Sequence, residues 1–180
     1  LSGIIATLRH VGIDAEVTVL SADPARTMVE HPGVAAIHRY RPTALIKAIR
    51  GADLVISGGG SLFQDVTSAR SVRYYLFVLQ LAHLLGRKSM VYAQGVGPLV
   101  RPNMRSAVAR TLDRVNIITV RDPESKTLLE EIGVDKPPIR LSADPSFMIK
   151  PDIEAADRII AEAGLTGKPT IGISLRPWKA

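Results

Sequence analysis

Short runs rich in Val and Ile alternate with amphipathic helical segments along most of the 180-residue chain, and this alternation constrains the fold more than any other feature. Strands are expected at 15–20, 34–38, 53–57, 88–93, 116–120 and 139–141, and helices at 1–8, 24–30, 42–50, 70–86, 102–115 and 123–132. Strands joined by helices run parallel, and the helices cover both faces of the sheet. The pattern therefore predicts a doubly wound, Rossmann-like α/β domain.

The two ends of the sequence suggest a piece of a longer protein. The chain opens at helical spacing (Leu1, Ile4, Leu8), although an α/β domain normally opens with a strand. Proline and glycine bracket a polar helix in residues 146–168, a composition typical of a connector, and an apolar run that predicts a strand follows at 170–175. We expect a first domain at 1–145 without its first strand, a connector at 146–168, and the first strand of a second domain at 169–180.

Composition excludes several classes of site. The chain has no cysteine, which rules out disulfides, thiolate-bound zinc and a cysteine nucleophile, and which fits a reducing cytoplasm. The apolar run 74–85 is too short to cross a bilayer and predicts a buried helix. The four histidines have no metal-ligand spacing, and His83 on that run is expected to be a packed residue. No metal site and no signal peptide are predicted.

Charge is unevenly distributed. Residues 1–115 hold 14 Lys and Arg against 7 Asp and Glu, whereas residues 116–180 hold 9 against 10. The basic part lacks the interleaved aromatic residues of a single-strand nucleic-acid binder. It favours an anionic small ligand or a phospholipid headgroup, with an ordinary solvated surface as the alternative.

Glycine-rich or polar residues follow four consecutive predicted strands, where ligands of parallel sheets bind. The candidates for substrate binding are Gly58, Gly59, Gly60, Ser61, Asp65, Gln94, Gly95 and Asp144. The glycine triplet suits an anion or a sugar hydroxyl, or simply forms a tight turn. The Gln94 amide can donate and accept hydrogen bonds and so suits the recognition of a sugar. The alternative is that Gln94-Gly95 forms only a structural turn.

Three charged residues at the strand ends have competing interpretations. Arg121 suits a carboxylate or phosphate and is the candidate catalytic residue, unless a salt bridge occupies it. Asp122 before Pro123 matches a helix N-cap better than a ligand group. Asp65 is equally consistent with binding a hydroxyl or acting as a base and with capping a helix.

Five sequence blocks together resemble the polysaccharide pyruvyl transferase family. They are Asp53 to Asp65 (DLVISGGGSLFQD), Tyr92 to Pro98 (YAQGVGP), Thr119 to Asp122 (TVRD), Ser142 to Pro145 (SADP) and Gly172 to Pro177 (GISLRP). Within the family, the resemblance is strongest to bacterial enzymes that pyruvylate N-acetylmannosamine in secondary cell wall polymers.

The resemblance implies two Rossmann-like domains facing a cleft, as in the glycosyltransferase-B architecture. It implies phosphoenolpyruvate as donor, held largely on the second domain with a family histidine, and an acceptor sugar held largely on the first. Arg121 would meet the donor anion, while the glycine triplet, Asp65, Gln94 and Gly95 would hold acceptor hydroxyls, with Asp144 a weaker candidate. No cofactor, metal or nucleotide is implied, and the 180 residues alone are expected to be inactive.

The implied partners are phosphoenolpyruvate and a lipid-linked glycan, and no nucleic acid. The implied location is the cytoplasm, with the inner face of the cell membrane as an alternative; peripheral membrane contact and a homo-oligomer are compatible with it. Two rival functions remain: a nucleotide-sugar glycosyltransferase of the same two-domain shape, and a non-catalytic module that binds a sugar or an anionic headgroup.

Overall fold

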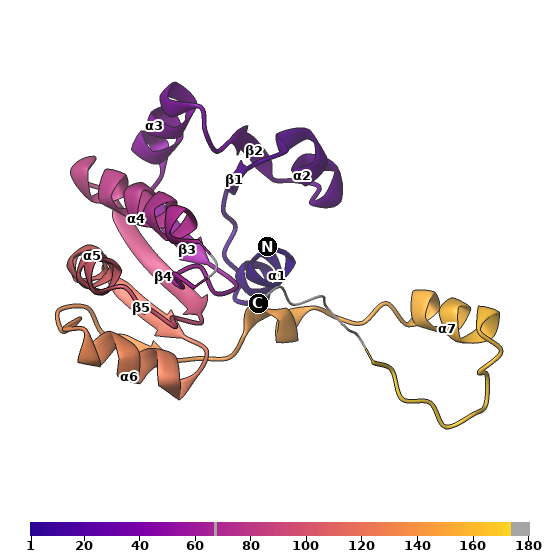
Figure 1. Ribbon diagram of the computed structural model, residues 1–180. Helices are drawn as coiled ribbons and strands as arrows, with labels where there is room; N and C mark the ends of the chain where they lie inside the picture. Colours follow the sequence, from indigo (N-terminus) through magenta and orange to yellow (C-terminus); the bar gives the residue numbers. More distant parts are fainter. Residues whose placement is uncertain (67, 174–180) are drawn as a thin grey trace. The chain divides into compact units, whose positions relative to one another are not determined.

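The computed structural model describes residues 1–66 and 68–173, and the chain divides into two compact units, Leu1–Ile149 and Lys150–Ala180 (Figure 1). Strands and helices alternate in the first unit as predicted. Its elements are α1 (Ser2–His10), β1 (Thr18–Ser21), α2 (Pro24–Glu30), β2 (Ala35–His38), α3 (Pro42–Gly51), β3 (Leu54–Gly58), α4 (Ala69–Leu84), β4 (Lys88–Gln94), α5 (Pro102–Leu112), β5 (Ile117–Val120), α6 (Pro123–Glu131), β6 (Ile139–Leu141) and the 3-10 turn η1 (Pro145–Met148).

Local sequence explains where the helices begin and end. Proline occupies the first position of α2, α3, α5 and α6, where its missing N–H costs no hydrogen bond. The Asp122 carboxylate accepts the Ser125 backbone N–H at 2.8 Å, so the predicted N-cap of α6 is confirmed. Helix α4 ends at Leu84, two residues before its predicted end, because Gly86 with φ +66° turns the chain out of the helix.

The strands form two parallel sheets. β1 pairs with β2, and a four-stranded sheet has the order β3-β4-β5-β6. The parallel α/β class is confirmed, but the single continuous sheet is not, since no ladder joins β1 to β3 within the described residues. Side chains connect them instead: Leu20 of β1 and Val55 of β3 both pack on the buried cluster made by α3 and α4.

Helices α4, α5 and α6 cover one face of the larger sheet, and the other face is only partly covered, since Leu54 and Ile56 of β3 are exposed there. Val91, Ile118 and Val120 point into one core with the buried faces of α4, α5 and α6. On the opposite face α1 approaches the ends of β3 and β4, where the Tyr92 hydroxyl donates to Thr7 Oγ1 at 3.4 Å. Gly3 of α1 lies so close to the Pro145 carbonyl that any side chain there would overlap it.

The second unit contains the predicted polar helix, α7 (Ile153–Glu162), which is capped by Asp152 and has no buried residue. Residues 170–173 form neither helix nor strand, and the remainder of the predicted 170–175 strand lies outside the described residues, as does most of the Gly172 to Pro177 block. Among the helices described, none combines the length and apolar character needed to span a bilayer.

Candidate functional site

The loops after β3, β4, β5 and β6 lie together at the carboxyl edge of the four-stranded sheet, because these parallel strands are immediate neighbours. Backbone hydrogen bonds join the loops. Gly95 N–H donates to the Gly60 carbonyl at 3.1 Å, and Arg121 N–H donates to the Gln94 carbonyl at 3.2 Å. The predicted convergence of the strand ends is therefore present in the structure.

A bulge in β4 shapes the site. Ala93 has φ +47°, in the left-handed region that a residue with a Cβ rarely adopts, and the register with β5 shifts between Val91 and Gln94. The Thr119 hydroxyl holds this conformation by accepting the Ala93 N–H at 2.7 Å. The bulge ends the regular ladder and turns Gly95 toward the neighbouring loops.

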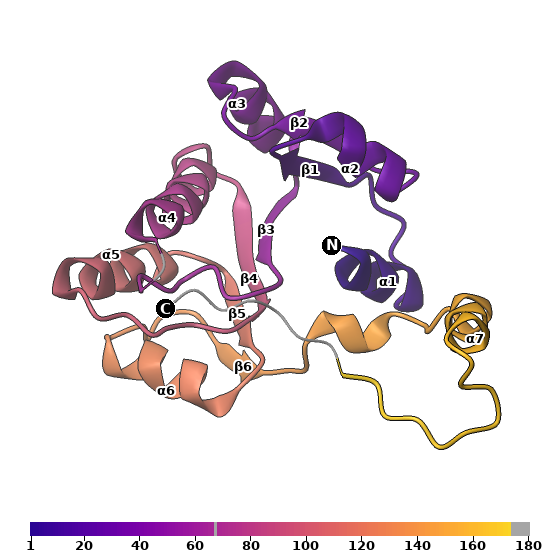
Figure 2. The same ribbon diagram turned by 45° about the vertical axis from the view of Figure 1, so that its right-hand side comes forward.

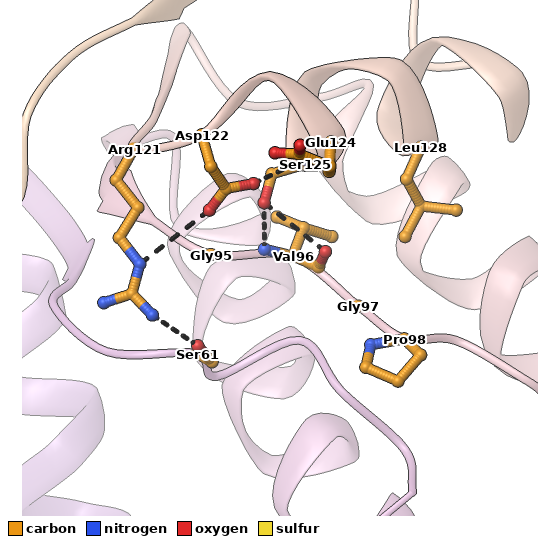
Figure 3. Close-up of a pocket in the computed structure, with 10 residues that line it drawn as sticks. All are labelled: Ser61, Gly95, Val96, Gly97, Pro98, Arg121, Asp122, Glu124, Ser125 and Leu128. Carbon is orange, nitrogen blue, oxygen red and sulfur yellow. Dashed lines mark hydrogen bonds and ion pairs between the residues drawn. The ribbon is translucent and has the colours of Figure 1, made fainter.

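The Arg121 side chain reaches the loop after β3, where Figure 3 shows its contact with Ser61. Its Nη2 donates to Ser61 Oγ at 2.9 Å and its Nη1 donates to Asp144 Oδ2 at 2.7 Å. Gly95 makes this arrangement possible, since a Cβ at that position would come within 2.9 Å of Ser61 Oγ and 3.1 Å of Arg121 Nε. One cation thus links the ends of β3, β5 and β6.

The Arg121 charge is largely offset by neighbouring carboxylates. Asp144 forms the close ion pair, and Asp122 lies 3.9 Å from Nε. The Ser146 backbone N–H lowers the pKa of Asp144 most, helped by the Ser146 hydroxyl and Arg121 against partial desolvation, so Asp144 is ionised at neutral pH. From the sequence, a salt bridge was the alternative role of Arg121, and the structure shows this salt bridge, with Asp144.

A shallow cavity of about 390 Å³ opens beside Arg121 (Figure 3). Its lining residues are Ser61, Gly95, Val96, Gly97, Pro98, Arg121, Asp122, Glu124, Ser125 and Leu128. One cation faces two carboxylates in this lining, with hydroxyl and backbone groups between them. Such a surface can bind a neutral polyhydroxyl ligand better than a multiply charged anion.

Ser125 joins the β4 loop to α6. Its hydroxyl accepts the Val96 N–H at 2.7 Å, and its own N–H is held by Asp122. Sequence reasoning missed Ser125, Glu124 and Leu128. Their signal was available, because the first two turns of a helix that follows a strand end face the same edge as the loops.

The predicted glycine triplet forms the turn after β3 but does not line the cavity. Gly59 and Gly60 both have φ +75°, and the Gly60 carbonyl is used by Gly95. Gly58 faces α1, where Ile4 would contact any added Cβ. In this loop, Ser61 is the residue that reaches the cavity.

Asp65 and Gln94 are fully buried rather than part of the cavity wall. The Asp65 carboxylate accepts the backbone N–H of Val100 at 2.8 Å and of Arg101 at 2.9 Å, so it anchors the segment that leads into α5. Gln94 Nε2 donates to Ser57 Oγ at 3.0 Å, while its Oε1 has no hydrogen-bond partner within the described ranges. Both side chains support the loops from beneath.

Comparison with known proteins identifies a family. The sequence model of the family described as polysaccharide pyruvyl transferase matches residues 1–166. No curated protein and no solved structure matches the chain.

Proposed function

The chain belongs to the polysaccharide pyruvyl transferase family, a family of transferases, and we propose that it transfers the pyruvyl group of phosphoenolpyruvate to a sugar of a cell-wall polysaccharide precursor. The proposed acceptor is N-acetylmannosamine in a lipid-linked glycan. The family match over 166 of 180 residues is the observation that carries this proposal.

The reaction balances without an external oxidant or reductant. The methylene carbon of phosphoenolpyruvate gains a proton and becomes a methyl group, while the neighbouring carbon forms bonds to two hydroxyl oxygens of one sugar. The bond from that carbon to the phosphate oxygen breaks, and phosphate leaves with the remaining proton. The product is a cyclic ketal, and the steps need a proton donor, a base and cations for the donor's negative charge.

We assign the cavity beside Arg121 to the acceptor sugar. Its lining supplies the Ser61 hydroxyl and the Asp122 and Glu124 carboxylates, which can pair with hydroxyl groups. Its single cation is already paired with Asp144, so the cavity alone is a poor site for the triply ionisable donor. The donor would then be held mainly by groups outside this unit, as in a two-domain glycosyltransferase-B-like enzyme.

Arg121 is the group proposed to bind the donor at the point where the donor approaches the acceptor. A guanidinium has five N–H groups, and Arg121 uses two in its hydrogen bonds to Ser61 and Asp144. The others remain for a carboxylate or phosphate oxygen of the donor. Asp144 and Ser61 would fix the orientation of the guanidinium during the reaction.

Kinetics of the full-length protein that contains this sequence test the proposal. Phosphate release from phosphoenolpyruvate should require an acceptor that contains N-acetylmannosamine. Ser61→Ala should raise the acceptor KM by about tenfold, the effect of about 1.4 kcal/mol, and should raise the donor KM by less, since Arg121 keeps its ion pair with Asp144. Ser106→Ala, on the exposed face of α5, is the matched control and should leave both unchanged.

Three outcomes would contradict the proposal. A rise in the donor KM alone for Ser61→Ala would show that the cavity binds phosphoenolpyruvate. Turnover with a nucleotide sugar in place of phosphoenolpyruvate would support a glycosyltransferase, and acceptor binding without any phosphate release would support a non-catalytic sugar-binding module.

A further inference from the structure

Helices α3, α4 and α5 together form a basic outer surface. They lie in a row with α4 in the middle, as both ribbon views show (Figures 1 and 2). Val78 and Ala82 of α4 pack against α3, and Gln80 Nε2 donates to Thr111 Oγ1 of α5 at 2.9 Å. The three helices contain six Lys and Arg residues and no Asp or Glu.

The outward line of α4 combines charge with exposed apolar side chains. At 100° per residue, Arg70, Arg73, Phe77 and Leu84 fall within an arc of about 60°, opposite the buried Val72, Leu79 and Ala82. Phe77 is 50% exposed and Leu84 is 80% exposed. Two cations and two large apolar groups therefore point the same way from one helix.

The neighbouring helices extend this surface. On α3, Lys47 and Arg50 lie opposite the buried Leu45 and Ile49, and Ile46 beside them is 38% exposed. On α5, Arg110 is exposed opposite its buried residues, which include Val108. The surface is defined here as Ile46, Lys47, Arg50, Arg70, Arg73, Phe77, Leu84 and Arg110 and is called the α3–α5 face.

The cations of the α3–α5 face are not neutralised by the protein. Among the ion pairs of residues 1–66 and 68–173, none involves Lys47, Arg50, Arg70, Arg73 or Arg110. Of the acidic residues nearest in sequence, Asp65 is buried beneath Arg101, and Asp113 binds Lys136 at 3.0 Å. Asp53 follows the end of α3 and forms no ion pair in the part of the chain that the structure describes. The basic character ends at α6, where Glu131 pairs with Arg105.

We propose that the α3–α5 face docks on the surface of a bilayer that contains anionic lipid. Clustered Lys and Arg attract acidic headgroups, and exposed Phe, Leu and Ile can enter the boundary below them. Phe77 and Leu84 favour a lipid surface over a nucleic acid, which offers charge but no hydrocarbon layer. Arg70 and Arg73 lie in the first turns of α4, which follows the β3 loop that carries Ser61, so one end of the docked face would lie near the edge where the candidate site opens. The inference does not depend on the proposed reaction.

Vesicle binding by the 180-residue chain tests this inference. The chain should sediment with phosphatidylglycerol vesicles and not with phosphatidylcholine vesicles, and added salt should release it. Arg70→Gln with Arg73→Gln should weaken binding about 30-fold, the equivalent of about 1 kcal/mol for each cation. Arg140→Gln with Arg158→Gln removes the same charge from exposed positions elsewhere and should have a much smaller effect.

A spectroscopic variant tests the apolar contact separately. In a Trp178→Phe background, Phe77→Trp should shift its emission to the blue with phosphatidylglycerol vesicles and be quenched by brominated lipid. Far-ultraviolet circular dichroism confirms that each variant is folded. Absence of vesicle binding, an equal loss in the two double variants, no emission shift, or binding to RNA but not to vesicles would each overturn the proposal.

Discussion

Replacing Asp65 with alanine should destabilise the fold without directly removing a ligand contact. The carboxylate is fully buried and accepts two backbone N–H groups, those of Val100 at 2.8 Å and Arg101 at 2.9 Å. Each hydrogen bond to a charged group contributes about 1.5–3 kcal/mol to stability. In the variant, the freed N–H groups of this partly exposed segment would bind water and so recover part of that free energy. We expect a loss of about 3 kcal/mol in the free energy of unfolding, or about 6–12 °C in Tm.

Urea denaturation of the 180-residue chain, followed by circular dichroism, measures this loss. Asp65→Asn keeps one acceptor oxygen and should cost less than Asp65→Ala, while Asp157→Asn on exposed α7 should change stability by less than about 0.5 kcal/mol. If Asp65→Ala changed the free energy of unfolding by less than about 1 kcal/mol and abolished acceptor binding, the reasoning would be refuted and Asp65 would be a substrate-binding residue.

Three further predictions concern the residues around the cavity. Arg121→Ala in the full-length protein should lose most turnover yet change unfolding by less than about 1 kcal/mol, because its ion pair is partly exposed; unchanged turnover would remove Arg121 from the site. Gly97→Ala should lower the free energy of unfolding by about 2 kcal/mol in urea denaturation, since φ is +92° and the added Cβ would overlap Leu128. Gly59→Ala, at φ +75° but with open space around the Cβ, should lower it by about 1 kcal/mol. Equal losses for the two variants would contradict the overlap. The pKa of Asp144 is lowered, so its ionised carboxyl stabilises the fold above about pH 4, and this contribution disappears as the pH falls through the lowered pKa. Asp144→Asn should therefore be less stable than the parent protein at pH 7, and the difference in the free energy of unfolding should shrink below about pH 4. A difference that stays constant with pH would contradict the assignment.

Most of the fold could be predicted from the sequence because local signals agree with it. Val and Ile runs mark the strands, and Asp122-Pro123 marks the start of α6 as a cap and a first helical residue. The division into two sheets could not be predicted, since it depends on whether β1 and β3 come within hydrogen-bonding distance, which neither segment encodes alone.

The candidate site was predicted at the level of loops better than at the level of side chains. The carboxyl ends of neighbouring parallel strands must meet, so Ser61, Gly95, Arg121 and Asp144 were brought together as expected. Which side chain faces the cavity depends on the backbone bulge at Ala93, where no glycine signals a left-handed conformation. Asp65 was grouped with the candidate ligand residues because it follows the β3 end, although its oxygens accept backbone N–H groups inside the protein.

The mass of the acceptor glycan after incubation with full-length protein and phosphoenolpyruvate tests the proposed function most directly. If the enol oxygen of phosphoenolpyruvate is isotopically labelled, the glycan should gain one unlabelled pyruvyl ketal and the label should leave with phosphate. An acceptor of unchanged mass, or a ketal that retains the labelled oxygen, would contradict the proposed transfer.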